Sequence, residues 1–340
     1  MSTSKTAVVI LNWNGRNFLQ QFLPIVISKS PTAKIYVADN ASTDDSVEFV
    51  NNNYPEVNVI QNNLNAGFAG GYNLALKKID TDYYILLNSD VEVTDNWIEP
   101  VIEFMDANPE VAACQPKILD FANREKFEYA GASGGFIDYL GYPFCRGRIF
   151  DEVEFDKGQY NDAVNVFWAT GACMFIRSKL FHKLNGFDES FFAHMEEIDL
   201  CWRLINRGYL NAVVPSSIVY HVGGGTLQKT NPRKTYLNFR NSLIAYTKNY
   251  AGNLLFLKLY LRLLLDGVAA IKFLSEGKFR EIAAIVKAHW KFFLCFFRIL
   301  KLRNLEKQEW RPGYSNNLIL NKSIVRLHFL KAVKKYSDIK

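Results

Sequence analysis

The chain has 340 residues, of which 49% are hydrophobic, 14% aromatic and 22% charged, and its net charge is +6. This composition excludes an intrinsically disordered chain and can fill the core of one large domain or two smaller ones. The five cysteines are scattered and form no C-x-x-C pair, which is atypical of a disulfide framework or a zinc site. The polar start leads directly into a strand-like run without the features of a signal peptide, so we expect a cytosolic protein.

The first 120 residues alternate between short apolar runs and longer stretches of helical periodicity. Strands are expected at residues 7–13, 34–39, 57–62, 83–88 and 111–118. Helices are expected at residues 16–28, 43–53, 68–79 and 95–107. This alternation predicts an α/β fold with a parallel sheet covered on both faces, in which ligands bind beyond the carboxyl ends of the strands.

Polar residues follow the first four of these expected strands. They are Asn12, Asp39 with Asn40, Asn65, and the run Asn88-Ser89-Asp90. Taken alone, the last run is typical of a surface turn. A carboxylate such as Asp90 at a buried strand end nevertheless requires a partner or a metal, because burying an isolated charge is costly. Four polar strand ends at one edge of the sheet indicate a binding site.

A glycine-bearing loop, NLNAGFAGGYN, follows the third expected strand. The absence of G-x-G-x-x-G after the first strand argues against a dinucleotide-binding dehydrogenase, and the absence of G-x-x-x-x-G-K-[ST] argues against a P-loop enzyme. Gly67 would let the backbone approach a ligand, although a tight turn from strand to helix explains this glycine equally well.

Three acids begin a second region of interest. Ile198, Trp202 and Ile205 recur at helical spacing, which predicts an amphipathic helix over residues 196–207. Its first turn carries Glu196, Glu197 and Asp199. Acids are also favoured at a helix start by the helix dipole alone. Further along, His221 ends a strand-like run, where a lone histidine is more often structural than a ligand.

Six motifs carry a family resemblance. In order, they are VVILNWNG, VADNASTDDS, NLNAGFAGGYN, YYILLNSDV, GACMFIRSKLFHKLNGFDESFFAHMEEIDLCWRLINRGY and VYHVGGGT. Together they resemble the family 2 glycosyltransferases of GT-A fold, especially the bacterial rhamnosyltransferase-like branch. The resemblance covers roughly residues 5 to 250. It implies a Rossmann-like, mostly parallel nucleotide-binding sheet flanked by helices, followed here by a C-terminal helical extension.

The resemblance implies a metal-dependent site for a nucleotide sugar. The family's metal motif falls on Asn88-Ser89-Asp90, so that Asp90 would bind Mg²⁺ or Mn²⁺ against the donor diphosphate, with His221 as a second ligand. Asn88 stands where a fuller Asp-x-Asp motif has another acid. The loop from Gly223 to Lys234, rich in glycine and basic residues, would close over the diphosphate, although a solvated loop explains it nearly as well.

The resemblance also assigns the nucleotide pocket. Asp39 would read the base or its ribose, and a carboxylate that accepts an N–H suits uracil or thymine, which favours a UDP- or dTDP-sugar. The other residues expected around the donor are Asn12, Asn40, Asn65, Gly67, Asn88 and Ser89.

The general base is expected in the first turn of the helix at 196–207. The family motif usually reads Glu-Asp-x-Asp with the second acid as base, and that position is Glu197 here. Glu196 is the alternative. Asp199 is expected to pair with Arg203 four residues later and to brace the helix.

The last part of the chain is strongly basic. Residues 1–230 carry 18 Lys+Arg and 28 Asp+Glu, a charge of −10, whereas residues 231–340 carry 22 and 6, a charge of +16. Apolar segments at 254–274 and 282–302 are interrupted by charges at helical spacing, so neither is expected to span a bilayer. Such helices suit an anionic membrane surface. They would alternatively pack on the catalytic domain or form a contact between two copies.

These expectations combine into one hypothesis. Residues 1–235 form a GT-A catalytic domain, with a nucleotide-sugar-binding half at 1–120 and an acceptor half at 121–235, and residues 236–340 form a basic helical extension. The protein would be an inverting glycosyltransferase that moves one sugar, rhamnose or another hexose, to a cell-surface polysaccharide or a polyprenyl-diphosphate-linked glycan at the inner face of the membrane. The alternative is a catalytically silent nucleotide-sugar-binding scaffold. The tail is too apolar for a nucleic-acid binder.

Overall fold

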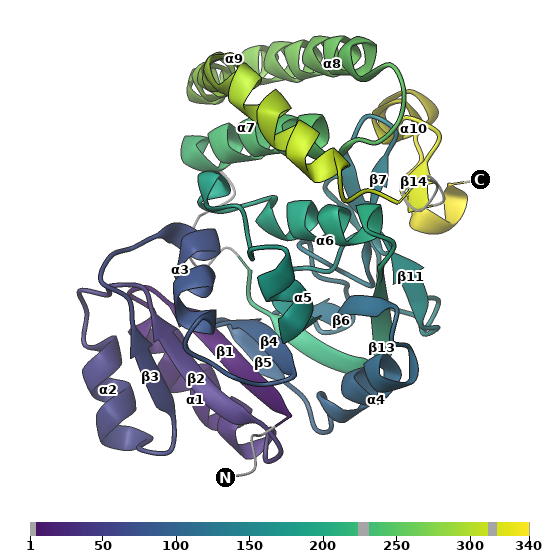
Figure 1. The fold of residues 1–340 in the computed structure, drawn as a ribbon. Coiled ribbons are helices and arrows are strands. Elements are labelled where there is room, and N and C mark those ends of the chain that lie inside the picture. The colour runs from purple at the N-terminus through teal and green to yellow at the C-terminus, as the bar shows by residue number, and fades with distance from the viewer. Residues whose placement is uncertain (1–4, 224–230, 312–317, 340) are drawn as a thin grey trace.

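The computed structural model describes residues 5–223, 231–311 and 318–339 (Figure 1). Four parallel strands form the N-terminal half of the central sheet, in the order β4-β1-β2-β3. Their bounds are β1 (Thr6–Asn12), β2 (Lys34–Asp39), β3 (Asn58–Gln61) and β4 (Tyr83–Asn88). These are the first four strands expected from the sequence. Asn12 pairs in register with Asp39, and Leu11 with Asn88, so the polar strand ends meet at one edge.

Helices cover both faces of this half. They are α1 (Arg16–Ser28), α2 (Ser46–Asn53), α3 (Gly67–Leu76) and α4 (Glu99–Ala107). Strand side chains alternate between the two faces. Val8 and Ile10 belong to the core that contains α1, α2 and α4, whereas Ala7 and Val9 belong to the core that contains α3.

The other half of the central sheet is mixed. It contains β5 (Val91–Val93), β6 (Val111–Asp120), β11 (Val164–Val166), β12 (Cys173–Arg177) and β13 (Leu210–His221). β6 and β13 are parallel to each other, but β12 lies between β4 and β6 and is antiparallel to both. The expected parallel sheet is therefore correct for β1 to β4 and incomplete beyond them.

A small second sheet joins the middle of the chain to its end. Its strands lie in the order β10 (Glu152–Val153), β9 (Arg148–Ile149), β8 (Pro143–Cys145), β7 (Gly135–Asp138) and β14 (Ile319–Leu320). The short helix α10 (Ile324–Lys331) packs on it through Ile324 and Leu327, and a 3₁₀ turn, η3 (Tyr336–Asp338), follows. The last part of the chain thus contacts the region between residues 121 and 235 directly.

The remaining helices extend from the middle of Figure 1 to its top. They are α5 (Ser178–Lys183), the 3₁₀ turn η1 (Glu189–Phe191), α6 (Glu196–Asn206), α7 (Pro232–Asn249), α8 (Leu255–Ser275) and α9 (Phe279–Lys307). The expected boundary between residues 235 and 236 falls inside α7, and Trp202 of α6 packs edge-on against Tyr246 of α7. No helix in the described ranges is both long and apolar enough to cross a membrane.

Candidate active site

The end of β1 is fixed to the end of β2 by a buried polar contact. Asn12 Nδ2 donates to Asp39 Oδ1 at 3.1 Å and lies 3.1 Å from Ser42 Oγ. The other oxygen of Asp39 accepts the backbone N–H of Ser42 at 3.0 Å. Asp39 is only 2% exposed. The two strands bring these residues together because they are parallel and in register, as the sequence predicts.

The glycine-bearing loop joins this cluster through Asn40. Its Nδ2 lies 3.1 Å from Asn65 Oδ1 and 2.9 Å from the carbonyl oxygen of Gly67. Gly67 has a φ of +70°, and a Cβ at this position would lie 2.4 Å from the carbonyl oxygen of Phe192. Glycine is thus required both by the left-handed turn and by the close approach of the segment before α6. Of the two explanations for Gly67, the structure directly supports the tight turn.

Ser89 faces the same edge as Asn12. A Cβ built on Gly15 would lie 2.5 Å from Asn12 Oδ1 and 3.5 Å from Ser89 Oγ, so the bare backbone of Gly15 separates these two side chains. Gly15 closes the motif VVILNWNG, three residues after the end of β1, but the sequence pattern did not mark it as a site residue.

Asp90 and His221 meet at the end of the central sheet. His221 Nε2 lies 3.2 Å from Asp90 Oδ1 and 3.5 Å from Asn88 Nδ2, and the other ring nitrogen lies 3.4 Å from Glu128 Oε1. Burial disfavours the charged imidazole, but the carboxylates of Glu128 and Asp90 outweigh this effect and raise the pKa of His221 to about 10. Asp90 therefore has the partner that its buried position requires.

Glu128 is a member of this cluster that the sequence analysis missed. It follows an isolated bridge between Leu119 and Phe127, outside any strand expected from periodicity. Its second oxygen accepts the N–H of Ala130. No local pattern distinguishes this acid from a surface residue, because only the fold brings it to His221.

The Asp90 and His221 pair fits a divalent cation that arrives with a diphosphate. Within the described ranges no group of three or more His, Cys, Asp or Glu side chains could hold a metal. Mg²⁺ sites in phosphate-binding enzymes typically use one or two carboxylates together with substrate phosphates and water, and imidazole is a common ligand of transition metals. One carboxylate and one imidazole at the strand ends match this donor set once the cation displaces the proton that Asp90 and Glu128 favour on the ring.

The two candidate bases begin α6. Glu196 is 4% exposed and Glu197 is half-buried, and neither Oε2 has a hydrogen-bond partner in the described part of the chain. Burial, reinforced by the charge of Glu197, raises the pKa of Glu196 well above its usual range. Burial also raises the pKa of Glu197, to about 7, against hydrogen bonds from backbone N–H groups. A carboxylate in this range can accept a proton near neutral pH.

The rest of α6 differs from the expected amphipathic helix. Ile198, Trp202 and Ile205 are buried as predicted, but the polar residues of the opposite face are buried too. The predicted pair is confirmed, since Arg203 Nε lies 2.8 Å from Asp199 Oδ2. The polar face is covered by α7, which the periodicity of α6 alone could not reveal.

Individual contacts link the separate clusters. Gly15 links Asn12 to Ser89, and the backbone N–H of Phe68 in α3 donates to the carbonyl of Phe192, close to the acids. Burial raises the pKa of the Cys145 thiol, Arg148 opposes this effect, and the charges of Glu128 and Glu197 add to it, so both acids act on the same thiol. Most of the loop expected to close over the site, residues 224–230, lies outside the described residues.

Comparisons with known proteins give the family. A model of glycosyl transferase family 2 matches residues 7–184. The chain is 26% identical over 238 residues to N-acetylglucosaminyl-diphospho-decaprenol L-rhamnosyltransferase of Mycobacterium tuberculosis, across 64% of this chain and 76% of the relative. It is 24% identical over 221 residues to rhamnosyltransferase WbbL of Escherichia coli, across 63% and 82%.

Solved structures agree on the fold. GalNAc-T7 with UDP, GalNAc and Mn²⁺ superposes with a TM-score of 0.56 at 17% identity, over 73% of this chain and about half, 48%, of that one. The mannosyltransferase PcManGT from Pyrobaculum calidifontis, with GDP-Man and Mn²⁺, gives 0.53 at 13% identity over 91% and 86%. The chain therefore belongs to glycosyl transferase family 2, in its rhamnosyltransferase-like branch, and is a glycosyltransferase of GT-A fold.

Proposed function

We propose that the protein is an inverting, metal-dependent glycosyltransferase that moves rhamnose or another hexose from a UDP- or dTDP-sugar to a hydroxyl of a cell-surface polysaccharide or lipid-linked glycan. The observation that carries this proposal is that Asp39 and the Asp90–His221 pair lie at the ends of sheet strands, while the segment before Glu197 contacts the start of α3 beside them. The named relatives act as rhamnosyltransferases, and one carries a diphospho-decaprenol acceptor in its name, which supports the acceptor class.

The donor would bind over the ends of β1 and β2. A carboxylate offers about four acceptor positions, so Asp39 can accept the N3–H of uracil or thymine in addition to its bonds from Asn12 and Ser42. Asp90 and His221 would hold Mg²⁺ or Mn²⁺ beside the diphosphate, with Asn88 next to them. When bound, the cation neutralises the charge that develops on the leaving diphosphate.

The chemical step would be a single displacement. The acceptor oxygen forms a bond to the anomeric carbon as the bond from that carbon to the diphosphate oxygen breaks, which inverts the configuration. Glu197 takes the proton of the acceptor hydroxyl. Its unpaired Oε2 and its pKa near 7 suit this role, because a base is most effective when its pKa lies near the working pH.

The orientation of α8 supports a location at a membrane surface. Its polar stripe faces the protein, since Arg262 is 2% exposed and donates to the Leu140 carbonyl, while Asp266 is 1% exposed and accepts from the hydroxyl of Tyr142. The outward stripe is apolar and consists of Leu257, Leu261, Leu264, Val268 and Ile271. An apolar stripe of this length on the outside requires a cover.

The exposed side chains of α9 indicate what kind of surface would cover these apolar faces. Trp290 is 68% and Phe297 84% exposed, in an outward stripe with Val286 and Phe293. The adjacent stripe carries exposed basic residues, which are Lys287, Lys291, Arg298 and Lys301. Apolar rings bordered by Lys and Arg match an anionic lipid surface in both polarity and charge, so we propose peripheral binding at the inner face of the cell membrane.

A donor panel tests the proposed reaction. UDP-, dTDP- and GDP-sugars are incubated with the protein and Mn²⁺, and slow hydrolysis of the donor is measured. We expect hydrolysis of a UDP- or dTDP-sugar that is lost with EDTA and in Asp90→Ala, while Asp90→Ala melts within a few degrees of the wild type.

Asp95→Ala is the matched control, because Asp95 is an exposed acid in the same part of the chain and contacts only Lys29 among the described residues. Its activity should be normal. Hydrolysis that resists both EDTA and Asp90→Ala would exclude the metal site, and turnover of GDP-sugars alone would exclude the donor class.

A further inference from the structure

The segment directly before the catalytic acids has an unfavourable backbone conformation. Phe192, His194 and Met195 have φ values of 65°, 68° and 74°, and none of them is glycine. Such residues cost on the order of 1–3 kcal/mol each and persist only where the surroundings hold them. Because Glu196 and Glu197 follow immediately, whatever holds this segment also places the acids.

Helix α7 holds one side of the segment through Asn241. Its Nδ2 lies 3.0 Å from the carbonyl oxygen of Phe191, 2.9 Å from that of Ala193 and 2.7 Å from that of His194. Asn241 itself is fully buried. One side-chain amide thus meets three carbonyl groups, and those of Ala193 and His194 would lose this hydrogen bond without it, which is costly.

Arg240 adds to this contact from the neighbouring position on α7. Its Nη2 lies 2.9 Å from the carbonyl oxygen of Ser190 and 3.0 Å from that of Phe191. Together, two consecutive side chains of α7 meet the backbone from Ser190 to His194.

The opposite side of the segment is held by the donor half. The carbonyl oxygen of Phe192 accepts from the N–H groups of Phe68 and Ala69, at 2.7 and 3.2 Å, at the start of α3. Gly67 permits this approach because it has no Cβ. The segment therefore lies between the start of α3, beside the expected nucleotide pocket, and α7.

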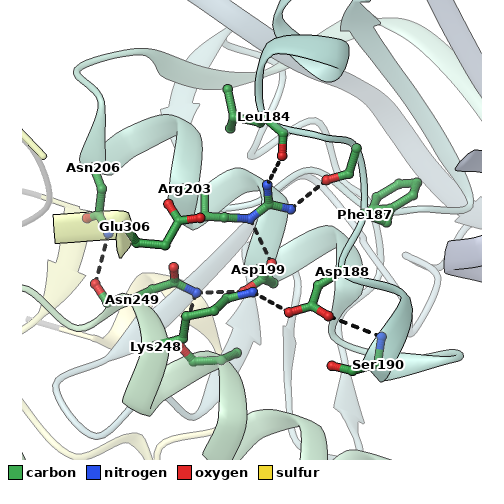
Figure 2. Close-up of polar contacts among 12 residues, drawn as sticks. Leu184, Phe187, Asp188, Ser190, Asp199, Arg203, Asn206, Lys248, Asn249 and Glu306 are labelled. Atoms are coloured by element: carbon green, nitrogen blue, oxygen red, sulfur yellow. Dashed lines mark hydrogen bonds and ion pairs between the residues drawn. The ribbon is translucent and has the colours of Figure 1, made fainter. Parts of the chain in front are cut away.

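Near the C-terminal end of α7, an ionic contact holds α6, the helix that begins with Glu196 and Glu197. Figure 2 shows Lys248 between Asp188 and Asp199, at 2.7 and 2.8 Å. Asn249 Nδ2 also lies 2.7 Å from Asp199 Oδ1. Asp199 is two residues after Glu197, so α7 contacts the backbone just before the acids and a side chain just after them.

We propose that Asn241, assisted by Arg240, is a positioning residue for catalysis, which holds the segment from Phe191 to Met195 so that Glu197 faces the acceptor hydroxyl. This inference rests on the proposed role of Glu197 as the base. It makes α7 part of the active site, although α7 supplies no group to the reaction.

The test compares Asn241→Ala with Asn238→Ala. Asn238 lies three residues earlier on α7 and makes no side-chain hydrogen bond to any other described residue. Asn238→Ala therefore controls for the effect of replacing an asparagine of α7 by alanine. We expect Asn241→Ala to lower kcat for transfer by about 10 to 100-fold, since small displacements of a catalytic group have effects of this size. UDP affinity, measured by calorimetry with Mn²⁺, should change less than twofold.

Two variants of Arg240 test the same role if Asn241→Ala folds poorly. Arg240→Met removes hydrogen-bond donors at a less buried position, so it should also lower kcat, but by a smaller factor than Asn241→Ala. Arg240→Lys keeps a donor and should restore part of this loss. The pH at which kcat is half-maximal should shift in Asn241→Ala, because a displaced Glu197 has different surroundings. A structural role alone would leave this midpoint unchanged.

The outcomes separate this inference from the proposed function. If Asn241→Ala and Arg240→Met transfer sugar as fast as Asn238→Ala, the positioning role is wrong. It is also wrong if UDP affinity falls as much as kcat, since the whole site would then be disturbed. If Glu197→Gln is fully active, the base is wrong, whatever Asn241→Ala does.

Discussion

Two adjacent carboxylates begin α6, and their surroundings make them chemically different. Glu196 is almost fully buried next to the charge of Glu197, and both effects raise its pKa well above its usual range. Glu197 is less buried, and its pKa of about 7 lets it lose its proton in the working range. The raised pKa favours the protonated form of Glu196, and Glu197 can accept a proton in the working range. The position that the sequence motif favours is thus also the one that the electrostatics favour.

Replacing Glu197 by Gln should separate binding from chemistry. The amide keeps the size of the side chain but cannot take a proton, so kcat should fall by about 10² or more while donor affinity changes little. In the wild type, kcat should rise with pH through about 7 and then level off, because the base acts only when deprotonated. Both effects are measured from the rate of transfer by the wild type and by Glu197→Gln at pH values from about 5.5 to about 8.5, in steps of about half a unit.

The same variant has a predictable effect on stability. The pKa of Glu197 rises from 4.5 when unfolded to about 7 when folded, so its contribution is fully present below pH 4.5 and is lost as the pH rises through about 7. Glu197→Gln should therefore melt no lower than the wild type at pH values above about 7. Normal turnover in this variant together with loss in Glu196→Gln would move the role of base to Glu196.

At the scale of elements, α6 and α7 are joined by charges rather than by apolar residues alone. Arg203 and Lys248 both contact Asp199, and Arg203 also donates to the carbonyl oxygens of Leu184 and Gly186 at 2.8 and 2.7 Å (Figure 2). Each charge in this group has a partner, which offsets the cost of burying it. Removing one member would leave an opposite charge buried and unpaired.

Lys248→Met should destabilise the fold in a pH-dependent way. Burial alone would raise the pKa of Asp188, but Lys248 and the hydrogen bonds from Ser190 outweigh it and lower this pKa below the usual 3.8. The stability that Asp188 contributes is thus present above pH 3.8 and is lost as the pH falls toward its folded pKa. We expect a loss of about 3–5 kcal/mol in the free energy of unfolding at neutral pH, and a smaller loss in acid.

Urea unfolding at neutral pH and at about pH 3, which is below the unfolded pKa of Asp188 so that part of its contribution is lost, measures this difference. Lys301→Met is the control, because Lys301 is exposed on α9 and has no ion pair among the described residues. Equal free energies of unfolding for the two variants at neutral pH would mean that the buried ion pairs do not hold α6 to α7.

At the scale of the whole molecule, the catalytic region and the extension are continuous. Leu243 and Tyr246 of α7 lie in the same core as strand residues of the central sheet, and β14 pairs with β7. The outer faces of α8 and α9, two helices at the top of Figure 1, expose large apolar side chains. Apolar burial and charge attraction would both act at these faces, and salt screens only the second.

Reversing three charges on α9 should weaken membrane binding. Lys291, Arg298 and Lys301 are changed together to Glu, and each lost attraction is worth about 1 kcal/mol near an anionic surface, so affinity should fall by about 10²-fold or more. Vesicles with anionic lipid are sedimented with the protein at several salt concentrations. Wild-type binding should decrease with salt without vanishing, because the apolar contribution remains.

The control reverses three exposed lysines of the catalytic region, Lys77, Lys78 and Lys183, which gives the same change in net charge. Its vesicle binding should be close to that of the wild type. A wild-type protein that ignores anionic vesicles at low salt and sediments as a dimer would show that a second copy covers these faces.

The sequence by itself determined the elements of the nucleotide half. The strands at 34–39 and 83–88 coincide with those expected, and Asn12 meets Asp39, because alternation of apolar runs is a local property and parallel strands necessarily end at one edge. The contact between Asp199 and Arg203 was likewise predictable, since residues four apart on a helix are neighbours.

Only the tertiary structure decided how distant segments meet. Glu128 reaches His221, Asn241 reaches the carbonyls before Glu196, and β12 inserts between β4 and β6, each across long stretches of chain. The sequence also revealed the charged stripe of α8 but not its direction. Arg262 faces inward because Leu140 and Ser242 supply acceptors there, and a hydrogen-bonded charge can be buried where an isolated one cannot.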